Sequence, residues 1–159
     1  MPEGKDLKDL VISITEYPHM PYWATLREAI VQLNVAYETG HHTVLVFDEA
    51  YSLLGLLHQS DILKGVRPEY AELCPPDVQI KWEDLMESAT GQLEKPIQDF
   101  MTAFDVTVDI DDHLLKVAHL MINNNIGLLP VMESNKIMGV IRMHDLFYEI
   151  AEFILKSKL

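Results

Sequence analysis

Several features are scarce or absent in this chain of 159 residues. Cys74 is the single cysteine, which excludes an internal disulfide framework and a zinc site built on cysteines. No segment approaches the roughly 20 apolar residues of a membrane span, and the charged N-terminus is not followed by the apolar stretch of a signal peptide. We therefore expect a cytoplasmic protein without membrane insertion.

Basic residues are also scarce. Twelve lysines and arginines stand against 25 aspartates and glutamates, a net charge of −13, and no local basic patch reverses it. Such a charge repels phosphate backbones, so nucleic acid is a poor candidate for a partner. Glycines number only seven while 48% of residues are hydrophobic, which indicates a globular core in one domain or two small, closely packed ones.

The two halves of the chain resemble each other. Residues 53–63 read LLGLLHQSDIL and residues 137–147 read IMGVIRMHDLF, so that Gly55 corresponds to Gly139 and Asp61 to Asp145. Upstream of each segment lies a run with the spacing of an amphipathic helix. The two runs comprise Leu26, Ala29, Ile30 and Leu33 in one half and Leu114, Val117, Ala118 and Met121 in the other. The larger offset of the helices places about four extra residues of the first half in the connection 35–42.

Each helix has a start signal and is followed by two short apolar strands. Thr25 with Glu28 predicts a capping box for the first helix, and Asp111 or Asp112 can cap the second. We expect strands at 43–47, 53–57, 128–132 and 137–141, and a leading strand at 106–110. In the first half, Pro18 and Pro21 confine the leading strand to an edge or a bulge.

A helix resumes after each aspartate, so the order strand, helix, strand, strand, helix occurs twice in an α+β fold. We assign residues 1–66 to a first repeat and residues 95–159 to a second repeat with a C-terminal helix. Residues 67–94 between them are acidic and contain prolines, and they are interpreted as a linker with a turn of helix at 82–86.

These patterns together resemble a known family. The second half reads PIQDFM at 96–101, IGLLPVM at 126–132 and GVIRMHDL at 139–146, and the first keeps TLREAI, VLVFD and GLLHQSDIL. The whole chain is similar to a tandem pair of CBS (cystathionine-beta-synthase) domains, a Bateman module. The resemblance implies two repeats packed sheet to sheet about a pseudo-twofold axis, with clefts that can hold AMP, ADP, ATP or S-adenosylmethionine.

The resemblance also implies ligand-binding residues. In the family the repeat aspartate accepts hydrogen bonds from ribose hydroxyls, and a threonine or serine three positions earlier contacts phosphate. Asp61 and Asp145 match the aspartates, whereas His58 and Arg142 stand at the hydroxyl positions. Arg142 could chelate a phosphate or pair with one of the many acids, and the two aspartates could equally be helix N-caps.

Further positions follow from the same resemblance. Thr107 corresponds to a residue that faces the ligand, and Ile126, Gly127 and Leu128 correspond to a loop beside the adenine ring. The aligned segments of the first repeat are His19 with Met20, and His42 with Thr43 and Val44. His41 and His42 are adjacent and lack a carboxylate at ligand spacing, so we expect no metal site. No catalytic set is recognisable, and we expect a protein that is not an enzyme.

The resulting hypothesis is a regulatory module that senses an adenosine-containing ligand, requires no cofactor and acts on a separate, unidentified protein. The apolar residues Leu146, Phe147, Ile150, Phe153 and Ile154 of the last helix predict a homodimer. Two alternatives stay open at this point. One is an interaction scaffold whose clefts are filled by Met20, Tyr22, His58 and Arg142, and the other is a sensor of a cyclic dinucleotide.

Overall fold

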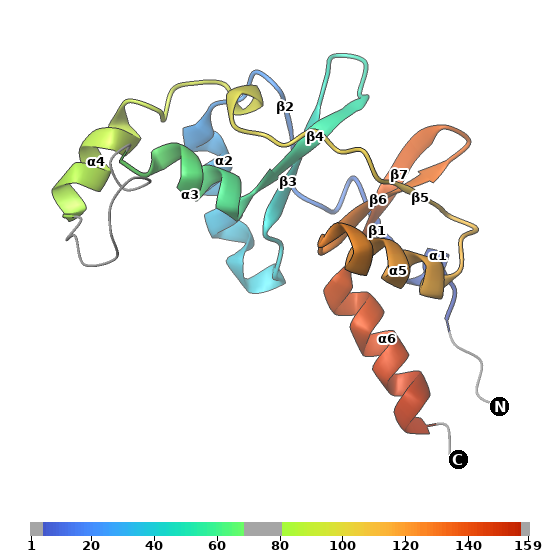
Figure 1. The fold of residues 1–159 in the computed structure, drawn as a ribbon. Helices are drawn as coiled ribbons and strands as arrows, with labels where there is room; N and C mark the ends of the chain where they lie inside the picture. The colour runs from blue at the N-terminus through green and yellow to red at the C-terminus, as the bar shows by residue number, and fades with distance from the viewer. Residues whose placement is uncertain (1–4, 69–80, 157–159) are drawn as a thin grey trace. The chain divides into compact units, whose positions relative to one another are not determined.

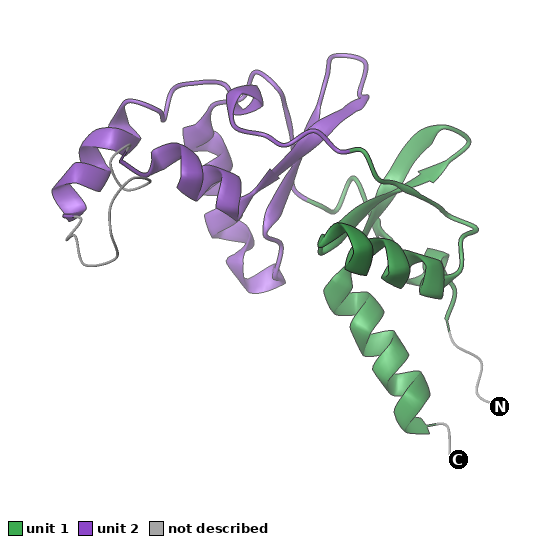
Figure 2. Cartoon of the chain, in the orientation of Figure 1, with its two compact units in different colours: residues 1–17, 105–159 green, residues 18–104 purple. Residues whose placement is uncertain are grey.

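The computed structural model describes residues 5–68 and 81–156 (Figure 1). The chain divides into two compact units: residues 1–17 and 105–159 form unit 1, and residues 18–104 form unit 2 (Figure 2). Both combine helices with a sheet, which confirms the α+β class. Unit boundaries differ from the repeats assigned above, because residues 1–17 lie with the second repeat and residues 95–104 lie with the first.

The described residues of unit 1 form a mixed, four-stranded sheet and three helices. Its elements are α1 (Leu7–Leu10), β1 (Ile12–Ser13), β5 (Val108–Asp109), α5 (Leu114–Asn124), β6 (Leu128–Glu133), β7 (Lys136–Arg142) and α6 (Met143–Lys156). The strand order is β1-β7-β6-β5, with β5 parallel to β6 and the other pairs antiparallel. The N-terminal segment therefore supplies an edge strand to the sheet of the second repeat.

The core of unit 1 joins one face of α5 to the sheet. Its buried residues are Leu7, Val108, Leu114, Val117, Met121, Leu129, Val131, Ile141 and Leu146. The three members from α5 follow the helical spacing read from the sequence, so the predicted inward face is confirmed. Burying these side chains supplies the main free energy that holds the helix on the sheet.

Unit 2 contains a three-stranded sheet of order β2-β3-β4. Its elements are β2 (His19–Pro21), α2 (Leu26–Val35), the 3₁₀ helix η1 (Ala36–Thr39), β3 (Thr43–Phe47), β4 (Leu53–His58), α3 (Gln59–Val66), α4 (Trp82–Thr90) and the 3₁₀ helix η3 (Ile97–Asp99). Among the described strands, β2 pairs with β3 alone and is an edge strand, as Pro21 within it and Pro18 just before it predict. The insertion expected at 35–42 forms η1, which ends at Gly40 in the left-handed region (φ 73°).

Three details differ from the sequence-based expectations. Helix α5 is capped by His113, whose Nδ1 accepts from the backbone N–H of Leu115 at 3.0 Å, and not by Asp111 or Asp112. The helix begins one residue later than expected, and the imidazole nitrogen replaces a carboxylate. Strand β5 has two residues where five were expected, and α4 runs for nine residues in place of a single turn. Residues 69–80 of the predicted linker lie outside the described residues.

The glycine of each repeat lies where another chain segment crosses the sheet. A Cβ atom at Gly139 would collide with the carbonyl oxygen of Ile12 in β1, and at Gly55 it would lie 2.7 Å from the carbonyl oxygen of Thr102. Thr102 and Leu56 exchange two backbone hydrogen bonds of 2.9 Å. Each unit thus needs glycine at this position, so that the crossing segment can approach the strand.

Candidate functional site

Arg142 and Asp145 form a two-point ion pair where β7 joins α6. Arg142 is the last residue of β7, and Asp145 lies in the first turn of α6. The guanidinium donates from Nε to Oδ2 at 2.8 Å and from Nη2 to Oδ1 at 3.0 Å. Their side chains are 20% and 26% exposed. This charge-assisted geometry engages both carboxylate oxygens and fixes their orientation.

The preceding loop lies against this pair. Gly127 accepts a hydrogen bond at 2.8 Å from the backbone N–H of Met143, the first residue of α6. Leu128 is the register partner of Arg142 in the β6–β7 ladder. The structure therefore brings together four of the predicted residues of the second repeat, at a helix N-terminus whose free amides favour an anionic group.

Arg142 and Asp145 line a hollow of about 540 Å³ within unit 1. The other lining residues are Lys5, Asp9, Leu10, Val11, Ile12, His144, Tyr148 and Glu149. They come from the N-terminal segment and from α6. This volume lies in the range of small-molecule sites, which run from about 300 to 1,000 Å³.

The second lysine or arginine of this hollow is also held by a carboxylate. Lys5 donates from its backbone nitrogen to Glu149 Oε1 at 3.2 Å, and its ammonium lies 3.9 Å from Oε2. Both positive side chains at the hollow, Lys5 and Arg142, therefore have acidic partners. An incoming anion must compete with these carboxylates for the cations.

Two other predicted residues of the second repeat are placed differently. Thr107 is exposed and precedes β5, whose Val108 pairs with Val131. That position is three residues along β6 from Leu128, or roughly 10 Å at the rise of a strand. Ile126 is partly buried and packs against the core of unit 1. Its backbone N–H donates to the carbonyl of Met121 at 3.1 Å.

In unit 2 the corresponding aspartate is held by uncharged donors. Asp61 Oδ2 accepts the backbone N–H of His58 at 2.9 Å, and Oδ1 accepts the hydroxyl of Thr102 at 3.1 Å. His58 Nδ1 lies 2.8 Å from the hydroxyl oxygen of Thr43, which is buried. The structure thus brings Asp61, His58 and Thr43 together.

The remaining residues predicted for unit 2 lie in its core. Met20 is 9% exposed, and Val44 is fully buried in the hydrophobic cluster. Their side chains pack against apolar neighbours. Tyr22, which was considered as a cleft filler, donates to Glu49 at 2.6 Å, and this hydrogen bond raises the pKa of Tyr22 and lowers that of Glu49.

Sequence reasoning missed three residues in these surroundings. Thr102, which holds Asp61, directly follows the PIQDFM motif, and extending that motif by one residue would have identified it. The N-terminal residues Lys5 and Asp9 line the hollow beside Arg142. No motif marks them, because their place depends on β1 pairing with a strand more than 120 residues later.

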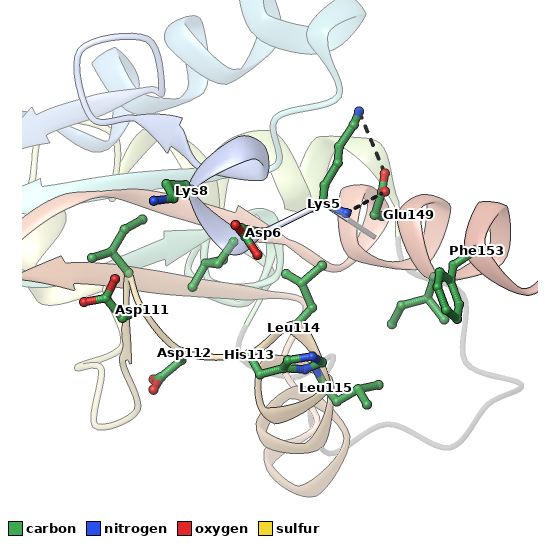
Figure 3. A pocket seen from close by; sticks show the side chains of 13 residues that line it. Lys5, Asp6, Lys8, Asp111, Asp112, His113, Leu114, Leu115, Glu149 and Phe153 are labelled. Atoms are coloured by element: carbon green, nitrogen blue, oxygen red, sulfur yellow. Dashed lines mark hydrogen bonds and ion pairs between the residues drawn. The ribbon is translucent and has the colours of Figure 1, made fainter. Parts of the chain in front are cut away.

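A second hollow of about 570 Å³ lies in unit 1 among α1, α5 and α6 (Figure 3). Leu114 and Phe153 contribute apolar surface, and Asp112 contributes a carboxylate. The backbone N–H of Asp109 donates to Asp112 at 2.9 Å, and this bond holds the pKa of Asp112 below its ordinary value against the opposing effect of burial. Lys116, whose ammonium lies 3.1 Å away, lowers the pKa further.

Residues 5–68 and 81–156 were compared with the requirements of a metal site and of a membrane-spanning helix. Within those ranges, no three histidine, cysteine, aspartate or glutamate side chains gather as the ligands of a metal ion would. No described helix has the length and apolar character needed to cross a membrane.

Comparison with known proteins agrees with this architecture. Residues 97–152 match the family model of the CBS domain. An uncharacterized protein of Methanocaldococcus jannaschii, MJ1426, is 26% identical over 114 residues, which are 64% of this chain and 68% of that protein.

Solved structures of CBS-domain pairs share the fold along nearly the whole chain. CBSX2 from Arabidopsis thaliana superposes with a TM-score of 0.72 at 15% identity, covering 98% of this chain and all of that one. A structure of CBSX2 in complex with AMP gives 0.66 at 18% identity, covering 97% and 100%. The CBS-domain pair of protein MJ0100, in complex with 5′-methylthioadenosine and S-adenosyl-L-methionine, gives 0.66 at 18%, covering 95% and 99%.

Proposed function

We propose that this chain, which has the fold of a tandem CBS-domain pair, is a regulatory module that binds an adenosine-containing ligand. AMP, ADP, ATP and S-adenosylmethionine are the candidate ligands. The observation that supports this most is the hollow at Arg142 and Asp145, which combines a carboxylate, a guanidinium and a helix N-terminus. Two structural relatives are complexes with AMP or with methylthioadenosine and S-adenosylmethionine.

Each residue of this site would have a defined task. Asp145 accepts hydrogen bonds from the ribose hydroxyls, and Arg142 contacts a phosphate. The backbone of Gly127 and Leu128 flanks the adenine ring, together with Ile126. Thr107, which directly precedes strand β5, would also face the ligand. In unit 2, Asp61, His58, Thr43, Val44 and Met20 are the equivalent positions, with Met20 and Val44 limited to backbone contacts by the burial of their side chains.

Regulation implies further partners. We propose that the chain forms a homodimer in the cytoplasm and that ligand binding changes its contact with a separate protein, without catalysis by the module itself. A ligand acts in this way only if it binds one conformation of the module better than another.

An interaction scaffold is the second candidate. It is favoured by the fact that both repeat aspartates already accept internal hydrogen bonds, from Arg142 in unit 1 and from Thr102 and His58 in unit 2. Such a scaffold would fold and dimerise in the same way, yet no adenine nucleotide would stabilise it.

Thermal unfolding separates the two candidates. We expect millimolar AMP to raise the melting temperature, because a ligand at 100 times its dissociation constant adds about 2.7 kcal/mol to the free energy of unfolding. Inorganic phosphate at the same ionic strength is the control, and a cyclic dinucleotide and S-adenosylmethionine complete the panel. Equal melting temperatures in all solutions would leave the scaffold as the function.

A further inference from the structure

We propose that Arg142 is a latch on the ribose-binding aspartate of unit 1, released only by a ligand that carries a phosphate. This inference rests on the proposed function and adds to it a preference for phosphorylated ligands over nucleosides. In the structure the guanidinium donates to both oxygens of Asp145, at 2.8 and 3.0 Å. The oxygens of Asp145 are then unavailable to the ribose of a nucleoside, and they become available when a nucleotide brings a phosphate for Arg142.

The two hydroxyls of a ribose need the same acceptor atoms that Arg142 uses. A carboxylate presents two oxygens, and the Arg142 guanidinium points one N–H group at each. A nucleoside must therefore displace or distort a charge-assisted pair of low exposure, and it offers only neutral hydroxyls in return. Arg142 would lose its carboxylate in the process, which opposes the binding of adenosine.

A phosphate group changes this balance. Phosphate and carboxylate both present two oxygens that match the planar fork of a guanidinium, so Arg142 can exchange one for the other without losing a charged partner. The start of α6 adds backbone amides that favour the anion at the same place. Asp145 is then free to accept the ribose hydroxyls, and every charged group in the hollow keeps a partner.

Among the described residues of unit 2, Asp61 has no arginine partner. The donors on Asp61 are a backbone amide and the hydroxyl of Thr102, and a phosphate exerts no comparable pull on either neutral group. The latch is thus a property of unit 1 and depends on arginine at position 142.

Titration calorimetry of the full-length chain with AMP and with adenosine tests the latch. In Arg142→Met we expect AMP affinity to fall by about tenfold or more, because a charged hydrogen bond is lost, while adenosine affinity rises by about three- to tenfold because Asp145 is released. Lys5→Met is the matched control, since it removes a cation of the same hollow that pairs with Glu149 and not with Asp145. This variant should bind AMP slightly more weakly than wild type and should bind adenosine with unchanged affinity.

Arg142→Lys provides a second variant that keeps the charge. An ammonium lacks the planar fork, so adenosine affinity should rise as in Arg142→Met while part of the preference for AMP is retained. If Arg142→Met loses AMP affinity and neither variant gains adenosine affinity, Arg142 is a simple phosphate contact and the latch is wrong. If wild type and both variants bind neither compound, the proposed function fails and the latch fails with it.

Discussion

The two repeat aspartates are chemically identical but differ in what holds them. Asp145 is paired with a guanidinium that a phosphate can draw away, whereas Asp61 is held by a backbone amide and by Thr102. The loop contact does not distinguish them, because the backbone N–H of Met143 donates to Gly127 in unit 1 and that of Gln59 donates to His42 in unit 2. We therefore expect Asp145→Ala to weaken AMP binding more than Asp61→Ala does. Calorimetry on both variants measures this order, and equal or reversed losses would contradict it.

For single residues, the sequence indicated which side chains lie close to Asp145 but not which hydrogen bonds and ion pairs they form. The spacing of three residues in a helix start brings Arg142 beside Asp145, and an ion pair with an acid was one of the two roles foreseen for Arg142. Which acid pairs with Arg142 could not be predicted, because several acids lie within reach of its long side chain. His113 replaced the expected aspartate cap, since a shift of one residue in the helix start changes which side chain faces the free amides.

Among the elements, the pairing of β1 with β7 depends on glycine at position 139. A Cβ atom there would overlap the carbonyl oxygen of Ile12 and would lie 2.5 Å from Cγ1 of Val11, so the backbone must move. We expect Gly139→Ala to lower the free energy of unfolding by about 1–3 kcal/mol, the usual cost of overpacking. Gly127→Ala is the control, because a Cβ at that exposed position meets nothing within 4 Å. Denaturant unfolding would contradict the account if both variants lost the same stability.

The start of α5 should show a pH dependence. The pKa of Asp112 is lowered in the folded state, so its contribution is present above the unfolded pKa of about 3.9 and is lost as the pH falls through the lower, folded value. We expect Asp112→Asn to cost about 1 kcal/mol or less at pH 7, because the side chain is partly exposed, and still less at pH 3. Unfolding curves at the two pH values measure the difference, and an equal cost at both would contradict it.

Most elements could be predicted from periodicity, and the failures share a cause. Helices α2 and α5 and the paired strands of each repeat follow local patterns that one face of a helix or strand imposes. Strand β1 was not predicted, because its two residues carry no pattern and gain their place only by pairing with β7. The grouping of residues 1–17 with unit 1 depends on the same pairing, which joins segments distant in sequence.

For the whole molecule, the outer face of α6 supports the predicted dimer. Leu146 is buried in unit 1 and Ile150 packs against its core, whereas Phe147 and Ile154 are 71% and 63% exposed. An exposed apolar helix face of this kind favours association. We expect the chain to sediment as a dimer at tens of micromolar, and the double variant Phe147→Glu, Ile154→Glu to sediment as a monomer.

Met86→Glu provides the control for that experiment. Met86 on α4 is 64% exposed, so this variant introduces the same side chain at an exposed apolar position of a different helix. It should leave the dimer intact. A wild-type monomer at these concentrations, or a dimer that survives both substitutions on α6, would remove the claim.

We propose above all that an adenine nucleotide binds beside Arg142 and Asp145 in unit 1. The most direct measurement follows the backbone amide resonances of the ¹⁵N-labelled chain as AMP is added. We predict that the earliest and largest shifts, saturating together, belong to Arg142 and Asp145, to the N-terminal residues that line their hollow, and to Gly127, which accepts from the start of α6. Spectra that AMP leaves unchanged, or shifts confined to Asp112, His113 and Phe153 of the second hollow, would contradict the account.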